Sequence, residues 1–175
     1  MKHKIVVVLV ALAAGSGVLT AGENPNFVVG NGLIGYTATT VPPQVRCEGG
    51  EPTNAFPPCS AGTRRAFGRA EQQVWMPASL SEPVASLLNG PLTFVVNCNF
   101  DAAYRGPCWG TFRWEAAGGA WEGQWVSPVM DLMTYESRIS MVGFGSGGAL
   151  EGKQLKVDGF SNPGDWYITI AARIH

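Results

Sequence analysis

The chain has 175 residues, of which 14% are charged, with 12 Lys and Arg against 13 Asp and Glu. Such a chain lacks the basic surface that nucleic-acid binding requires, so nucleic acid is excluded as the main partner. The two histidines are His3 and His175, which removes most mechanisms that need a buried imidazole, such as a Ser-His-Asp triad or a His-ligated metal.

Residues 1–22 have the layout of a secretory signal peptide. Lys2 and Lys4 precede an apolar run that begins at Ile5 and gives way to small residues. The alternative is an uncleaved N-terminal anchor. Cleavage would leave residues 23–175, a single domain of about 150 residues, and the loss of two lysines gives it a net charge of −3. We therefore expect a secreted or periplasmic protein with no membrane partner after cleavage.

Four cysteines follow the signal segment, and disulfides are the default state of cysteine in an exported chain. Three pairings are possible, and we favour Cys47–Cys59 and Cys98–Cys108 because each pair brackets a short loop that contains Pro or Gly. The first pair would hold a long Pro- and Gly-rich loop over residues 41–62. A zinc site is disfavoured because there is no C-x-x-C motif and no nearby histidine. We expect neither a metal nor a cofactor.

Short strands are predicted along the whole chain. Residues 23–40 indicate one or two strands broken by a turn at Gly30-Asn31-Gly32, and residues 63–76 favour a strand that ends at Pro77. One helical turn is expected at residues 84–88. Apolar and polar residues then alternate as in half-buried strands over residues 92–100, 109–116 and 166–174.

An internal repeat organises the second half of the chain. The segment Gly118-Gly119-Ala120-Trp121-Glu122-Gly123 returns 29 residues later as Gly147-Gly148-Ala149-Leu150-Glu151-Gly152. A Gly-Gly pair supplies the positive φ angles that a tight hairpin needs. The repeat therefore predicts two hairpins of an antiparallel β-meander.

A two-residue loop at Gly118-Gly119 would place four large aromatic side chains on one face of the first hairpin. It pairs Ala116 with Trp121, Trp114 with Gly123 and Phe112 with Trp125. The same register in the second copy sets Phe144 opposite Glu151 and Val142 opposite Lys153. Glycines within that copy suggest a bulge where the sheet curls into a barrel.

The repeat also carries a family resemblance. Trp121-Glu122-Gly123, followed by residues 145–152, resembles the glycine-rich strand-turn of the allene oxide cyclase and dirigent-like β-barrels, over residues 92–160. The resemblance implies an eight-stranded antiparallel barrel with an apolar lumen, often in homo-oligomers, that steers cyclisation or coupling of a hydrophobic intermediate. The pocket residues of that family do not map onto this chain one by one. Avidin- and lipocalin-like barrels are similar in layout and bind ligands.

Two motifs that suggest other chemistry are set aside. Residues 143–148 fit G-x-G-x-x-G, but the glycines and branched residues that follow do not favour the helix that a dinucleotide site needs. Glu122 and Glu151 hold equivalent places in the two repeats, and paired carboxylates can perform acid–base chemistry. Both are expected on the opposite face from the aromatic residues, in solvent.

We therefore predict an all-β protein, a small antiparallel meander barrel of about eight strands. The leading hypothesis for its function is non-catalytic binding of a small apolar molecule in the lumen; the alternative role for the aromatic residues is to fill the core. A second hypothesis is a cofactor-free cyclase or isomerase with Glu115, Glu122 or Tyr135 turned inward, and a third is a structural or interaction module of the cell surface. The residues expected to contact the ligand are Phe112, Trp114, Trp121, Trp125 and Tyr135.

Overall fold

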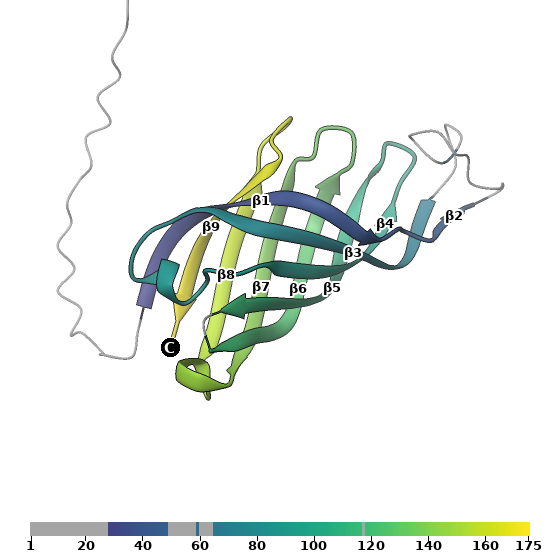
Figure 1. The fold of residues 1–175 in the computed structure, drawn as a ribbon. Coiled ribbons are helices and arrows are strands. Elements are labelled where there is room, and N and C mark those ends of the chain that lie inside the picture. Colours follow the sequence, from purple (N-terminus) through teal and green to yellow (C-terminus); the bar gives the residue numbers. More distant parts are fainter. Residues whose placement is uncertain (1–27, 49–58, 60–64, 117) are drawn as a thin grey trace, which may run out of the picture.

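The computed structural model describes residues 28–48, 59, 65–116 and 118–175, with the backbone alone for residues 65–71. Nine strands and two short 3₁₀ turns make up this part of the chain (Figure 1). The strands are β1 Val28–Val41, β2 Val45–Cys47, β3 Arg65–Leu80, β4 Leu92–Phe100, β5 Arg105–Ala116, β6 Gly119–Asp131, β7 Ser137–Ser146, β8 Gln154–Ser161 and β9 Tyr167–Ile174. The 3₁₀ turns are η1 Val84–Ser86 and η2 Gly148–Leu150.

Eight of these strands close into an antiparallel barrel. From β3 to β9 each strand pairs with the next along the chain, and β1 pairs with both β9 and β3. The short β2 adds to β3 outside this ring. In Figure 1, β1 and β3 cross in front of the other strands at a steep angle. The prediction of an all-β meander barrel is confirmed.

One end of the barrel, which we call the closed end, is covered by the connection between β3 and β4. The η1 turn lies there, beside the start of β1 and the end of β9 (Figure 1). Val84 and Leu88 from this connection are fully buried in the core. The expected helical turn is therefore present, and it is the cover of the barrel.

The expected break in the first strand and the expected end of the second are both wrong. β1 runs without interruption through Gly30 and Gly32, because their lack of a side chain admits close neighbours. A Cβ atom at Gly30 would lie 2.4 Å from Val84 Cγ2, and one at Gly32 would lie 2.4 Å from the carbonyl oxygen of Ser79. β3 continues past Pro77, which pairs with Ile34 beside an irregularity in the ladder, a position that tolerates proline.

The predicted register of the first hairpin is wrong by two residues. Trp114 lies opposite Trp121, Phe112 opposite Gly123 and Gly110 opposite Trp125. Gly118 takes the positive φ of the turn, 81°, and Gly119 already belongs to β6. A shift of two residues keeps every side chain on its face, and the four aromatic residues still point inward together.

The second hairpin has a wider connection than the repeat predicts. Gly147, Gly148 and Gly152 all have positive φ, and Glu151 accepts a hydrogen bond from the backbone N–H of Gly147 (2.7 Å). Residues 147–153 therefore form a seven-residue loop that contains η2. As a result Phe144 pairs with Gln154 rather than with Glu151, and Val142 with Lys156 rather than with Lys153.

Both favoured disulfides are present. Cys47 joins Cys59, with a Cα–Cα distance of 5.7 Å. Cys98 joins Cys108, its direct partner across β4 and β5, at 4.1 Å. The two bonds are compatible with an oxidising, extracellular environment. The signal segment 1–22 and most of the loop 41–62 lie outside the described residues.

Candidate lumenal ligand site

The aromatic residues near the closed end are buried in the lumen. Trp114 and Trp121 lie side by side and have no solvent exposure, and Phe112 is also buried. The indole N–H of Trp114 donates to the carbonyl of Gly90 (3.0 Å), and that of Trp121 to the carbonyl of Leu87 (2.9 Å). These bonds tie the β5–β6 hairpin to the cover of the barrel. The three side chains face inward as predicted, but they have no free surface to offer a ligand.

The opposite end of the barrel, which we call the open end, is different. Tyr36 follows the buried Ile34 by two residues on β1 and so faces the lumen, yet 36% of its surface is exposed. Trp75 lies directly opposite Tyr36 on β3 and is half-buried. Its indole N–H donates to Gln73 Oε1 (3.2 Å). At this end, inward side chains therefore reach solvent.

A series of six aromatic rings, which we call the aromatic chain, connects the rim of the open end with the interior. Ring centroids of consecutive members lie 4.9 to 6.3 Å apart, within the range of favourable aromatic pairs. Three consecutive pairs are edge-to-face, with angles of 70 to 88° between the ring planes. These pairs are Tyr36–Trp75, Trp75–Phe94 and Phe94–Trp125. In order from rim to interior, the members are Tyr135, Trp166, Tyr36, Trp75, Phe94 and Trp125.

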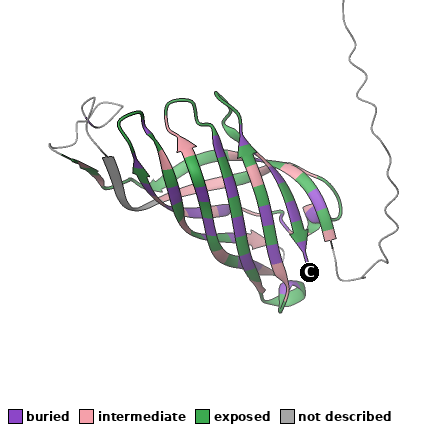
Figure 2. Ribbon diagram, turned by 180° about the vertical axis from the view of Figure 1, so that it is seen from behind, coloured by how far each residue is buried: buried purple, intermediate pink, exposed green. Residues whose placement is uncertain are grey.

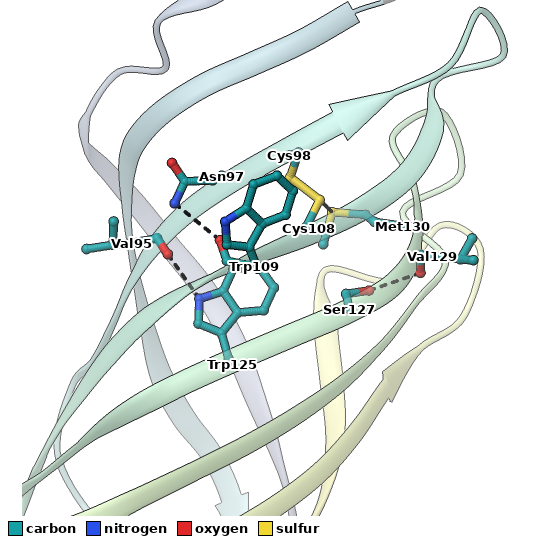
Figure 3. Close-up of a disulfide and its surroundings, with 9 residues drawn as sticks. All are labelled: Val95, Asn97, Cys98, Cys108, Trp109, Trp125, Ser127, Val129 and Met130. Atoms are coloured by element: carbon teal, nitrogen blue, oxygen red, sulfur yellow. Dashed lines mark hydrogen bonds between the residues drawn. A yellow bond between two sulfur atoms is a disulfide. The ribbon is translucent and has the colours of Figure 1, made fainter.

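Trp125 holds the inner end of the aromatic chain in place. Its indole N–H donates to the carbonyl oxygen of Val95 (3.0 Å), as Figure 3 shows. The bond passes over Gly110, where a Cβ atom would lie 3.0 Å from Trp125 Nε1. A glycine at this position on β5 is therefore what lets the indole reach across to β4. The Cys98–Cys108 disulfide lies farther along the same two strands, 3.6 Å from the sulfur of Met130 (Figure 3).

The rim is shaped by two loops that bind each other. Tyr135, in the β6–β7 turn, has φ 63°, a strained backbone state for a residue with a side chain. Its carbonyl oxygen accepts a hydrogen bond from Ser161, which also bonds to Ser137 (Oγ–Oγ 2.9 Å). The N–H of Gly164 donates to the carbonyl of Thr134 (2.7 Å). These bonds hold Tyr135 against Trp166, which is 57% exposed.

Among the residues whose side chains the structure describes, no acidic or basic side chain is buried. In the described part of the chain the buried polar side chains are Ser127, Ser137 and Ser161. Glu115 and Glu122 lie on the outer face, where both pair with Arg113. Glu115 first, and Glu122 second, raise the pKa of the exposed Arg113 guanidinium above its ordinary value. Of the three groups that a cyclase would draw on, only Tyr135 is at the mouth of the lumen.

The described residues also contain no group of three or more His, Cys, Asp or Glu side chains placed to hold a metal ion. No helix among them has the length and apolar character of a membrane span. The G-x-G-x-x-G segment runs from the end of β7 to the first residue of the three-residue η2, and the strand β8 follows that turn. It therefore lacks the helix on which a dinucleotide phosphate would rest.

Fold and site together define the class: a small, disulfide-containing, eight-stranded antiparallel β-barrel with one covered end and partly exposed aromatic side chains at the other. Comparison with family models, curated proteins and solved structures gives no match for this chain.

Four members of the aromatic chain, Tyr36, Trp75, Phe94 and Trp166, are absent from the set expected to contact a ligand. Tyr36, Trp75 and Trp166 come together only because β1 closes on β3 and because the β8–β9 loop lies at the same end. The available sequence signal was weak. Tyr36 follows Ile34 by two residues and so lies on the same face of a strand. Trp75 stands two residues before Pro77, in a segment whose apolar residues follow neither the helix period nor the strand period.

Proposed function

We propose that this chain is an exported protein that binds a small, flat, apolar molecule in the open half of its barrel without transforming it. The observation that supports this most is the aromatic chain, which begins at exposed rings on the rim and continues into the lumen. The interior of an eight-stranded barrel is just wide enough for side chains or for one small ligand. A ligand therefore fits where inward side chains leave room, at the open end.

The expected affinity follows from the area that such a ligand can bury. A molecule of two or three fused rings that buries about 300 Å² of apolar surface gains about 7 kcal/mol, before the cost of association. Stacking on Trp75 or Tyr36 adds about 1 kcal/mol per ring pair. With a cost of association of about 4 kcal/mol, the net gain of about 4 to 5 kcal/mol corresponds to dissociation constants of about 0.2 to 1 mM for simple aromatic probes.

Binding is favoured over catalysis by the polar groups of the lumen. General acid–base chemistry needs a titratable side chain within reach of the substrate, and the buried polar side chains of the described residues are serines that already bond to other groups. The two disulfides and the signal-like residues 1–22 support export. A cofactor-free cyclase would have to depend on Tyr135 alone among the three groups considered above.

The test is a titration of the mature chain with N-phenyl-1-naphthylamine, a neutral aromatic dye whose fluorescence rises in apolar sites. We expect saturable binding that weakens about tenfold in Trp75→Ala and in Trp166→Ala. Trp109→Ala is the matched control, because Trp109 is 41% exposed on the outside of β5, and its affinity should stay within about twofold of the unaltered protein. Non-saturable dye fluorescence, or equal losses in all three variants, would contradict the proposal.

A further inference from the structure

An open depression of about 760 Å³ lies on the outer wall of the barrel, over β7, β8, β9 and the start of β1. Exposed and buried positions alternate along these strands, as Figure 2 shows. Phe160 and Asp158 of β8 point into the depression, whereas Val157 and Ser161 are buried on the lumenal side. The depression is therefore separate from the lumenal site, and nothing in the proposed function uses it.

Two neighbouring rows of side chains form most of this surface. In the first row Phe160 lies between Arg138 on β7 and Thr169 on β9. In the second row Asp158 lies between Ser140 and Ala171, and Asn31 of β1 continues that row. Phe160 is 47% exposed, so one face of its ring is available among polar groups.

Asp158 is held in a fixed orientation. Ser140 Oγ donates to its Oδ1 atom (3.1 Å), and the guanidinium of Arg173 pairs with its Oδ2 atom. A carboxylate has about four acceptor sites, so each oxygen can still accept from a ligand. An ionised carboxylate donates no hydrogen bond, and the ligand must therefore supply the hydrogens.

Hydrogen-bond donors line the same depression. Among the residues that the structure describes, none forms a hydrogen bond or an ion pair with the guanidinium of Arg138. This group lines the depression together with the side chains of Asn31 and Thr169. Its five N–H donors remain available for acceptors of a ligand.

We propose that this depression is a binding site for a neutral oligosaccharide. A sugar ring has an apolar face of C–H groups that can pack on the Phe160 ring, and hydroxyls that both donate to Asp158 and accept from Arg138. The mixture of Glu136 and Asp158 with Arg138 disfavours a strongly charged ligand. The open shape disfavours an apolar one, because much of its surface would stay in water. A hydroxyl-rich ligand keeps its outer hydration at little cost.

The experiment is a titration of the ¹⁵N-labelled mature chain with maltotriose, cellotriose and N,N′,N″-triacetylchitotriose, followed by amide chemical shifts. We expect at least one of them to bind with a Kd of about 1 mM and to shift amides of residues 138–140, 158–160 and 169–171. Phe160→Ala should weaken binding about tenfold. The matched control is Phe144→Ala, an exposed phenylalanine on β7 outside the depression, which should change the Kd by less than about twofold.

A second variant tests the same site by filling it. Ala171→Gln places a longer side chain on the exposed face of β9 and should abolish the shifts while leaving the spectrum folded. The proposal is overturned if none of the three saccharides shifts these amides at about 20 mM. It is also overturned if Phe160→Ala and Phe144→Ala behave alike, or if Ala171→Gln binds as the unaltered protein does. None of these outcomes affects dye binding in the lumen, so the two proposals fail separately.

Discussion

Replacing Trp121 with phenylalanine tests whether the indoles at the closed end are structural. The side chain has no exposed surface, and its N–H donates to the carbonyl of Leu87 in the cover of the barrel. Phenylalanine keeps an aromatic ring on the same face but removes this donor and part of the volume. The change therefore separates the cover from the hairpin without adding a new polar group.

The cost can be estimated from two contributions. Loss of the hydrogen bond from Trp121 leaves the part-buried carbonyl of Leu87 without this donor, which should destabilise the fold by about 1 to 2 kcal/mol. The missing volume of about 40 Å³ adds about 1 kcal/mol at 24 cal/mol per Å³. We expect Trp121→Phe to lower the free energy of unfolding by about 2 to 3 kcal/mol, which lowers the Tm by about 5 to 10 °C in a domain of this size.

The measurement is urea unfolding followed by far-ultraviolet circular dichroism, with Trp166→Phe as the control. Trp166 is 57% exposed, so its replacement should change the free energy of unfolding by less than about 0.5 kcal/mol. The affinity of Trp121→Phe for N-phenyl-1-naphthylamine at low temperature should equal that of the unaltered protein. A loss below about 0.5 kcal/mol in Trp121→Phe, or a drop in its dye affinity while it is folded, would refute the division into a structural and a binding end.

Two further predictions concern the wall. Gly143→Val should cost more than about 3 kcal/mol, because a Cβ atom there would lie 2.6 Å from Phe112 Cζ and 2.8 Å from the carbonyl of Glu122; thermal unfolding should show it. Gly118→Ala is the control, because a Cβ atom at this position would meet no atom within 4 Å. Its only destabilising feature is the positive φ of 81°, which should cost about 1 kcal/mol. Replacing both Cys98 and Cys108 with alanine should cost about 2 to 3 kcal/mol through the entropy of the unfolded chain, and a Tm equal to that of the unaltered protein would contradict this.

The sequence predicts the faces of the strands better than it predicts their partners. Alternation is a local pattern, so Phe112, Trp114, Trp121 and Trp125 could be assigned to one face without knowledge of the loop. The register depends on which glycine takes the positive φ, and a shift of two residues leaves the pattern unchanged. Only the observed Gly118 at φ 81° places Trp114 opposite Trp121.

The open end could not be derived in this way. Tyr36 and Trp75 are 39 residues apart in the sequence and become partners only when β1 closes the barrel on β3. The closure brings Gly32 against the carbonyl oxygen of Ser79 and Gly30 against the side chain of Val84, and the sequence pattern at both glycines is typical of a turn. The outer depression could not be derived from the sequence either, because the residues beside Phe160 come from the strands on both sides of it.

The two ends of the barrel differ because indole N–H groups must be satisfied when they are buried. At the closed end Trp114 and Trp121 meet this need with carbonyls of the covering segment, which brings that segment down onto the lumen and excludes any ligand. Along the aromatic chain Trp125 and Trp75 use acceptors of the wall itself, Val95 and Gln73, so these two indoles bind no covering segment. The direction in which each indole finds its acceptor therefore distinguishes the closed end, where the indoles bind the cover, from the aromatic chain, where they bind the wall.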